Sequence, residues 1–209
     1  MKRRSLLVAA LLAGALTIGS QAQAKPTTWN IDPAHSRVSF TVRHLFSKVP
    51  GNFNTFSGAV VFDPEKPGTG SVQVEIDANS INTNVEKRDN HLRSADFFDV
   101  AKYPKLTFVS TGVKDLGGGK LEIAGNLTMH GVTKPVTLAA TVLGSGPGMS
   151  GKLTAGFEAT TKLDRTEYGV VWNAPLDTGG TLLSNDVDIT LNIEAVEHTE
   201  EAAPAPAKK

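Results

Sequence analysis

The stretch KLEIAGNLTMHGVTKPVTLAATV at residues 120–142 decides the fold class. Apolar side chains recur at every second position on both sides of the dipeptide His130-Gly131, with mostly polar residues between them. Because successive side chains of a strand point to opposite faces, this alternation predicts two strands that each have one apolar face. Gly131 suits the tight turn of a hairpin. The stretch therefore predicts an antiparallel β-hairpin.

Similar strand patterns recur along the whole chain. Eight segments are predicted as strands, at residues 37–43, 53–62, 72–78, 106–113, 121–129, 136–142, 153–161 and 187–195. Glycine- and proline-containing turns separate many of them, so we expect an all-β, antiparallel fold. Eight strands fit a closed barrel that holds one small ligand, and they also fit a two-sheet sandwich with a filled core. The strand count leaves both architectures open.

One segment between two of these strands breaks the alternation. Thr83 and Glu86 have the spacing of a capping box, in which each side chain bonds a backbone N–H of the first helical turn. Val85 and Leu92 are seven residues apart and share one side of a helix. We expect a short helical insertion near residues 84–94, which suits a lid or plug on a barrel.

The two ends of the chain differ from its body. Residues 1–24 have a basic start, an apolar run and the small-residue pattern Ala22-Gln23-Ala24, which are the parts of a cleaved signal peptide. The apolar run is shorter than the ~20 residues that span a bilayer, so we expect no transmembrane segment in the mature protein. Residues 25–196 form the predicted domain. The Ala/Pro-rich residues 197–209 are predicted to be a disordered tail.

Charge and cysteine content narrow the function classes. The chain has 21 basic and 21 acidic residues, and loss of residues 1–24 removes three of the basic ones. The resulting acidic excess argues against nucleic acid as a partner. The chain has no cysteine, so neither a disulfide nor a thiolate metal site holds the fold together.

Five segments carry a family resemblance. They are WNIDPAHSRVSFTVRHL at 29–45, GNFNTFSG at 51–58, INTNVEKRDNHLRSADFFDVAKYPKLTF at 81–108, AGNLTMHGVTKPV at 124–136 and LDRTEYGVVW at 163–172. Together they resemble the YceI-like, polyisoprenoid-binding family of bacterial exported proteins. The resemblance implies an extended, eight-stranded, lipocalin-like barrel whose apolar interior holds an isoprenoid lipid of the quinone or prenyl diphosphate type. It also implies a periplasmic carrier or stress-associated binding protein without a cofactor.

An isoprenoid tail needs an apolar tunnel and few polar contacts, because burial of its hydrocarbon surface supplies the binding free energy. We expect the ligand-binding side chains on the apolar faces of the strands and around the helical insertion. The candidates are Phe40, Val42, Phe62, Val74, Ile76, Leu92, Phe97, Phe98, Phe108, Leu127, Phe157 and Trp172.

A polar head group would need different side chains. Arginine suits phosphate because its planar guanidinium donates two hydrogen bonds in parallel. The candidates, which require the first long strand and the helix to meet at the barrel mouth, are Arg43, His44, Arg88, His91 and Arg93. The alternative for this cluster is a solvated helix face with local ion pairs.

Two other functions stay open at this stage. One is an enzyme that acts on an amphiphilic substrate through the His/Asp cluster near residues 88–99. We expect no catalytic residue and no metal site, since the chain has no G-x-S-x-G motif and no two histidines at metal-ligand spacing. The other is a stress or structural protein with a filled interior. The sequence does not fix the oligomeric state, and a dimer is compatible with it.

Overall fold

The computed structural model describes residues 27–149, 151–177 and 179–198. The predicted signal peptide at 1–24 lies outside these ranges, as do residues 199–209 of the predicted tail. Within the described part, no helix is long and apolar enough to cross a membrane.

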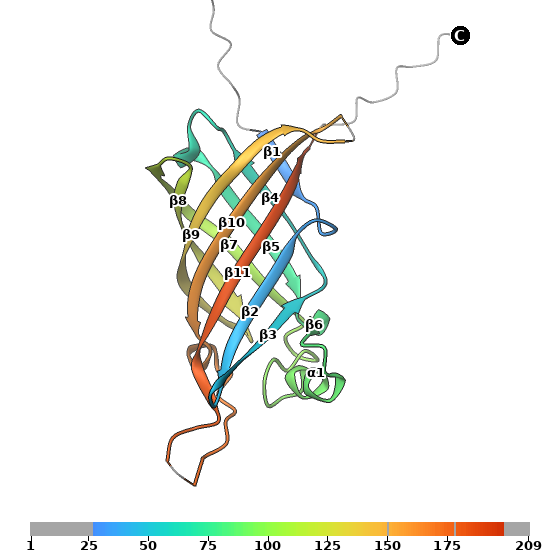
Figure 1. The fold of residues 1–209 in the computed structure, drawn as a ribbon, viewed down its shortest axis with the longest axis vertical. Helices are drawn as coiled ribbons and strands as arrows, with labels where there is room; N and C mark the ends of the chain where they lie inside the picture. The colour runs from blue at the N-terminus through green and yellow to red at the C-terminus, as the bar shows by residue number, and fades with distance from the viewer. Residues whose placement is uncertain (1–26, 150, 178, 199–209) are drawn as a thin grey trace, which may run out of the picture.

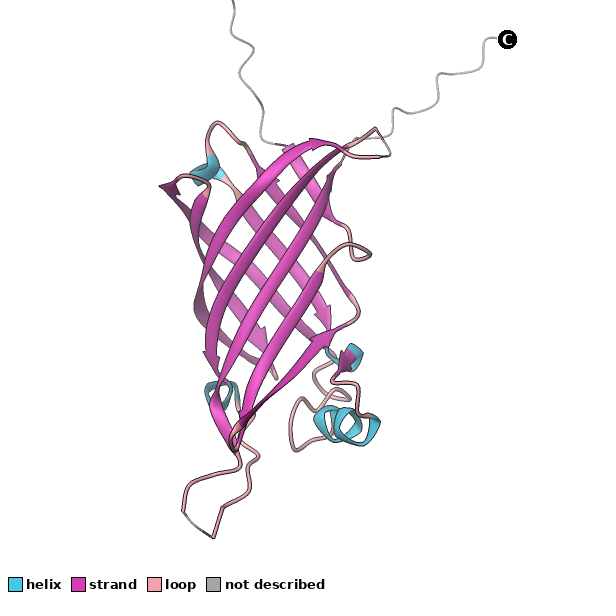
Figure 2. Cartoon of the chain, in the orientation of Figure 1, coloured by secondary structure: helices cyan, strands magenta, loops and turns pink. Residues whose placement is uncertain are grey.

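Strands make up most of the described chain (Figure 2). In sequence order they are β1 (Thr27–Ile31), β2 (Arg37–His44), β3 (Ser47–Phe53), β4 (Phe56–Phe62), β5 (Ser71–Asp77), β6 (Ile81–Asn82), β7 (Lys105–Gly117), β8 (Lys120–Met129), β9 (Val132–Pro147), β10 (Leu153–Asp164) and β11 (Leu183–Glu197). The described helices are α1 (Glu86–Arg93) and the short 3-10 turns η1 (Pro67–Thr69), η2 (Ala78–Ser80) and η3 (Arg165–Tyr168).

Eight strands form a closed antiparallel barrel (Figure 1). Around the barrel they follow the order β1, β4, β5, β7, β8, β9, β10 and β11, and β11 pairs with β1 to complete the circle. The barrel is therefore confirmed and the sandwich excluded. The predicted hairpin is also present: His130 and Gly131 both have positive φ, as the two-residue turn between β8 and β9 requires.

The remaining strands extend the barrel wall at the α1 end. β1 and β2 lie one after the other along β11, β1 opposite residues 195–197 and β2 opposite residues 183–192. At the break between them the Ser36 hydroxyl accepts a hydrogen bond from the backbone N–H of Glu194 (2.9 Å). A side chain thus replaces a backbone partner, which allows the strand to bend without leaving β11 unpaired.

The predicted strand at 53–62 is wrong in its first residues. Phe53 ends β3, which starts at Ser47, and β4 begins only at Phe56. The two residues between β3 and β4 form hydrogen bonds with the end of β5 and the segment that follows it. Asn54 donates its N–H to Ser80 O (3.1 Å), and Thr55 O accepts from the N–H of Asp77 (3.0 Å). These two hydrogen bonds direct the chain between β3 and β4 toward β6 and α1.

Helix α1 begins two residues later than predicted, and its expected capping box is absent. Val85 is the N-cap residue and makes no side-chain cap. Thr83 instead donates its N–H to Asp89 Oδ1 (2.8 Å), and its hydroxyl donates to the same oxygen. The buried carboxylate of Asp89 accepts both hydrogen bonds. Asp89 therefore anchors the segment before α1, which is the role that was expected of the capping box.

The predicted tail boundary at residue 197 is also corrected. Glu197 still lies opposite Trp29, and His198 donates its N–H to Thr28 O (2.8 Å). The edge of β1 thus offers backbone partners that composition alone does not reveal, and the folded chain continues at least to His198.

Candidate functional site

The barrel encloses a cavity of about 450 Å³. Its wall comes from β1 to β5 and β7 to β11, and its α1 end from α1 and the loops that follow α1 and β10. The lining is almost wholly aliphatic and aromatic. Small-molecule sites typically have volumes of roughly 300–1,000 Å³ and a mostly apolar lining, so the cavity has the properties of a binding site.

The twelve predicted apolar residues all lie on the cavity wall. Strand parity brings most of them there, because residues two apart on a strand share a face. Leu92, Phe97 and Phe98 come from α1 and the segment after it, and Trp172 from the loop after η3. Their contact with a ligand stays a prediction.

Contacts between aromatic rings occur at several points along the cavity. Phe62 and Phe157 meet edge to face (5.4 Å between centroids) near the end formed by β1. Phe53 contacts Phe98 of the insertion in the same manner (5.8 Å). At the α1 end Phe97 packs on Trp172 (5.1 Å). The cavity is thus bounded by rings at both ends.

The predicted head-group residues separate into two sets. His44, Arg88 and His91 line the cavity, whereas Arg43 and Arg93 do not. Arg43 is exposed because it alternates with the inward Val42 and His44. Three of the five residues thus line the cavity, and their contact with a head group stays a prediction.

Arg93 holds the insertion together. Its Nε donates to Asn79 O (2.8 Å) and its Nη2 to Ile81 O (2.8 Å), while Nη1 donates to the Asn90 side chain (3.0 Å). All three nitrogens of the guanidinium are therefore bonded within the insertion, between the segment that follows β5 and α1.

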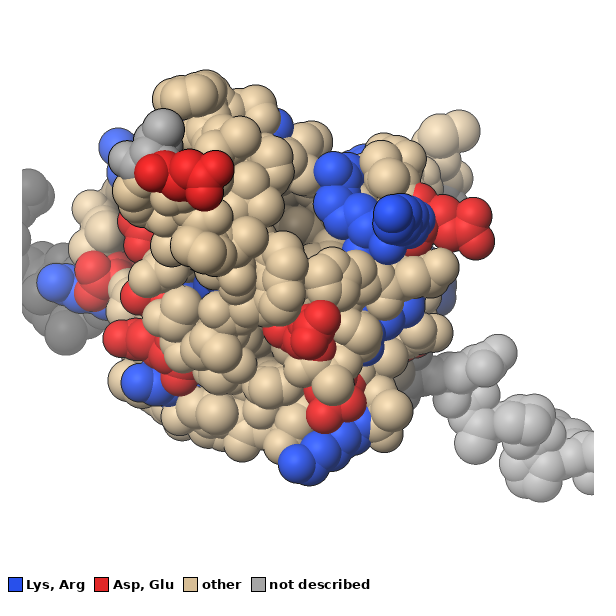
Figure 3. All heavy atoms as spheres, turned by 90° about the horizontal axis from the view of Figure 1, so that it is seen from below, with Lys and Arg blue, Asp and Glu red and all other residues tan. Residues whose placement is uncertain are grey.

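His91 links α1 to the loop after η3. Its ring lies edge-on to both Phe97 and Trp172 (5.0 Å each), and Nε2 hydrogen-bonds Asp96 (2.8 Å). Seen from this end, the molecule shows mostly uncharged side chains, with the largest group of basic side chains at one edge and other charged side chains around the rim (Figure 3). The α1 end is thus a mixed apolar and polar surface beside the cavity.

Sequence reasoning missed Arg165, a buried cation in the cavity lining. Its Nε donates to Ser184 O (3.0 Å), and its Nη1 donates to Val170 O (2.6 Å) and Trp172 O (2.9 Å). Burial lowers the pKa of Arg165, an effect that the nearby charge of Asp164 partly opposes. Its only signal in the sequence is its place in the segment LDRTEYGVVW, and nothing in its spacing indicates that it is buried.

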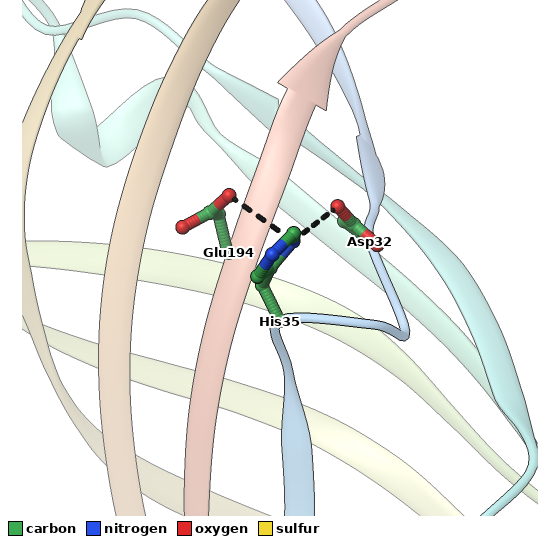
Figure 4. Close-up of side chains that lie close together, drawn as sticks. All are labelled: Asp32, His35 and Glu194. Carbon is green, nitrogen blue, oxygen red and sulfur yellow. Dashed lines mark hydrogen bonds and ion pairs between the residues drawn. The ribbon is translucent and has the colours of Figure 1, made fainter. Parts of the chain in front are cut away.

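Three polar side chains meet on the outside of the barrel at the break between β1 and β2 (Figure 4). His35 Nδ1 lies 2.8 Å from Asp32 Oδ2 and 3.7 Å from Glu194 Oε1. The hydrogen bond to Asp32 raises the pKa of His35, and the same bond lowers the pKa of Asp32. Among the described residues, this is the group whose donor atoms lie close enough to hold a metal ion. It does not line the cavity.

The family description "YceI-like domain" matches residues 29–195, which span the barrel from β1 to β11. This chain belongs to the YceI-like family. The UPF0312 protein of Vibrio parahaemolyticus is 40% identical to this YceI-like chain over 199 residues, covering 94% of this chain and 99% of the relative. The UPF0312 protein of Azotobacter vinelandii is 39% identical, covering 92% and 98%.

Solved structures agree with the family assignment. Burkholderia cenocepacia BcnA superposes on this YceI-like barrel with a TM-score of 0.71 and 30% identity, covering 79% of this chain and 99% of BcnA. A polyisoprenoid binding domain from Saccharophagus degradans gives a TM-score of 0.58 at 16% identity, covering 83% of this chain and all of the other, which shows a shared fold. The YceI-like fold thus surrounds an apolar cavity with the volume and lining of a small-molecule site.

Proposed function

We propose that this protein binds an isoprenoid lipid in the periplasm and carries or stores it with the apolar tail inside the barrel. The observation that carries the proposal is the cavity of about 450 Å³ with its nearly continuous aliphatic and aromatic wall. The name of the Saccharophagus degradans neighbour, a polyisoprenoid binding domain of the same fold, supports this ligand class. The head group is of the quinone or prenyl diphosphate type.

The energetics favour a long tail. Burial of a CH₂ group contributes about 0.8 kcal/mol, while association costs roughly 4–15 kcal/mol. A short apolar molecule therefore gains too little, whereas a tail of several isoprene units gains enough without any polar contact.

Native mass spectrometry tests the ligand directly. We expect protein purified from the periplasm of its own host to retain the mass of an isoprenoid lipid, and delipidated protein to take up an added prenyl lipid. Protein that is empty and also refuses added prenyl lipids would contradict the proposal and favour a filled interior.

A matched pair of variants locates the binding. Ala140→Phe adds a ring on the cavity wall, whereas Ala139→Phe adds the same ring on the exposed outer face of β9. We expect the first variant to lose most of the retained lipid and the second to keep it. Equal retention by both variants would place the lipid outside the barrel.

The proposed periplasmic location rests on residues 1–24, so the test uses this segment. Fused to alkaline phosphatase, which folds only after export, these residues should give active enzyme, and a fusion that begins at Lys25 should not. Activity from both fusions, or from neither, would contradict export by this segment.

A second candidate function follows from the pair of His91 and Asp96, since a histidine held by a carboxylate beside a cavity is an arrangement that general bases use. Its test is the release of phosphate or diphosphate from a bound prenyl diphosphate. Product formation that disappears in His91→Ala would favour the enzyme, and intact ligand after long incubation would favour binding alone.

A further inference from the structure

Arg165 is a buried cation for which the described residues provide no paired carboxylate. It is 6% exposed and follows directly after β10. None of the ion pairs found among residues 27–149, 151–177 and 179–198 includes it. The neighbouring Asp164 accepts hydrogen bonds from the N–H and hydroxyl of Thr166 instead. Among the described residues, only backbone carbonyls therefore lie within hydrogen-bond distance of this positive charge, and the charge of Asp164 acts on it without forming an ion pair.

One nitrogen of the Arg165 guanidinium also has no hydrogen-bond partner. Nε donates to the carbonyl of Ser184 in β11, and Nη1 donates to the carbonyls of Val170 and Trp172 in the loop after η3, which fixes the plane of the group. Nη2 is fully buried and has no hydrogen-bond partner. A buried charged donor without an acceptor is unfavourable, and such groups are rare in folded proteins. Arg165 is also part of the cavity wall, so the unpaired donor belongs to a residue that a ligand in the cavity would touch.

Arg165 lies at the α1 end of the cavity. Arg165 holds the carbonyl of Trp172, and the ring of Trp172 packs against His91 of α1. Arg88 lines the same cavity, and its Nε and Nη2 donate to Thr83 (2.7 and 2.9 Å). The two arginines of the cavity lining are thus at one end of the cavity, while the rings of Phe62 and Phe157 occupy the other.

We propose that Nη2 of Arg165 donates a hydrogen bond to an anionic oxygen of the lipid head group, and that this contact makes the protein prefer a prenyl phosphate or diphosphate to a neutral lipid with the same tail. The inference rests on the proposed lipid-binding function. Charge supports an anion: the lining contains Arg88 and Arg165, whereas its one carboxylate, Glu158, is exposed and alternates with the inward Phe157 and Ala159. A phosphate oxygen supplies both the acceptor and the missing counter-charge.

The test compares two probes with one tail, geranylgeranyl diphosphate and geranylgeraniol, on the full chain. Wild-type protein should bind the diphosphate at least about tenfold more tightly, since a charge-assisted hydrogen bond is among the stronger ones. Arg165→Lys keeps the charge but loses the Nη2 donor, so the preference should fall about tenfold while geranylgeraniol affinity changes little. Arg93→Gln is the matched control, because it removes a guanidinium that also holds backbone carbonyls but does not line the cavity.

The outcomes separate the two proposals. Failure of wild-type protein to bind either probe contradicts the lipid-binding function itself. Equal binding of both probes, or an unchanged preference in Arg165→Lys, overturns the role of Arg165 alone. A drop in preference that Arg93→Gln shows equally also overturns it, because the effect then comes from the loss of any guanidinium that binds backbone carbonyls.

Arg165→Lys could weaken the loops, which would appear as lost binding of both probes. A crystal structure of the wild-type complex with the diphosphate then decides. We expect a phosphate oxygen ~2.7–3.2 Å from Nη2. A phosphate placed elsewhere, with Nη2 still unpartnered, overturns the proposal.

Discussion

The two ends of the barrel are built on different principles. At the β1 end Trp29, Phe62, Ala155 and Ala195 are each less than 5% exposed, and β1 joins β4 to β11. At the α1 end the strands separate, and an insertion and a loop with buried polar groups cover the opening. The closed end gains its stability mainly from apolar burial, whereas the α1 end, which also buries Ile81, Phe97 and Tyr168, relies in addition on hydrogen bonds of a few charged side chains.

This difference has a functional consequence. A densely packed end does not open without losing the core, because cavities in such packing are costly. An end held by hydrogen bonds of single side chains can open locally at a smaller cost. We infer that any ligand exchange takes place at the α1 end.

Replacing Trp29 breaks the closed end and should have the largest effect. Trp29→Ala removes an indole that is 3% exposed, and we expect a loss of about 3–5 kcal/mol in the free energy of unfolding, measured by urea denaturation. Phe46→Ala is the control, since that ring is 98% exposed and its loss should change stability by no more than about 0.5 kcal/mol. Equal effects of the two variants would contradict the packed end.

Replacing Asp89 loosens the α1 end. Asp89→Ala leaves the N–H and hydroxyl of Thr83 without their acceptor, so we expect a loss of about 1–3 kcal/mol. Hydrogen exchange should accelerate at residues 81–98 more than at β1. Asp96→Ala, which removes an exposed carboxylate of the same insertion, is the control. Uniformly faster exchange along the chain would mean that the insertion does not open separately.

Gly125 tests the cavity between the two ends. A Cβ there would collide with the ring of Phe108, so Gly125→Val should push this ring into the cavity. We expect about 1–2 kcal/mol of destabilisation and weaker binding of a prenyl lipid. Gly112→Val is the control, because nothing lies within 4 Å of its added Cβ. Unchanged lipid affinity in Gly125→Val would show that Phe108 does not border the ligand.

The smallest expected effect concerns the pair of His35 and Asp32, where the bend between β1 and β2 contacts solvent. The pKa of His35 is raised above its ordinary value of 6.5, so its stabilising contribution is full below that pH and is lost as the pH rises through the folded-state pKa. The pKa of Asp32 is lowered from 3.8, so its contribution is present above 3.8 and is lost as the pH falls through the folded-state pKa.

Thermal unfolding of wild type and His35→Gln measures this contribution. The difference between their unfolding temperatures should be greatest at about pH 5, between the two ordinary pKa values, and should vanish at about pH 9. A difference that does not depend on pH would mean that the ion pair is not its source.

Sequence reasoning succeeded where a local pattern carries the information. Alternation of two predicted most of the strands, although not β1, β3 or β6, and placed Phe40, Val74 and Leu127 on the inner face, because side-chain direction in a strand depends only on parity. The helix was predicted within two residues at its start and one at its end. Its capping was not, because Thr83 had two partners of suitable chemistry nearby and tertiary burial favoured Asp89 over Glu86.

The site shows the same division. Arg43 and Arg93 looked equivalent to Arg88 in the sequence, yet Arg43 points outward and Arg93 bonds backbone carbonyls. The sequence gives no sign that Arg165 is buried, although carbonyls of the loop after η3 and of β11 surround it in the fold. Charged side chains are long and their partners distant in sequence, so spacing does not reveal which ones are buried.

By itself, the sequence determined the strand-rich class, the position of the insertion and the apolar faces, since each depends on neighbours a few residues apart. Only the tertiary structure decided that the sheet closes into a barrel, through the pairing of β1 with β11 across about 165 residues of chain. The same closure placed Arg165 inside an apolar cavity with one donor unpaired. Both features depend on contacts between residues far apart in the chain, which no local pattern encodes.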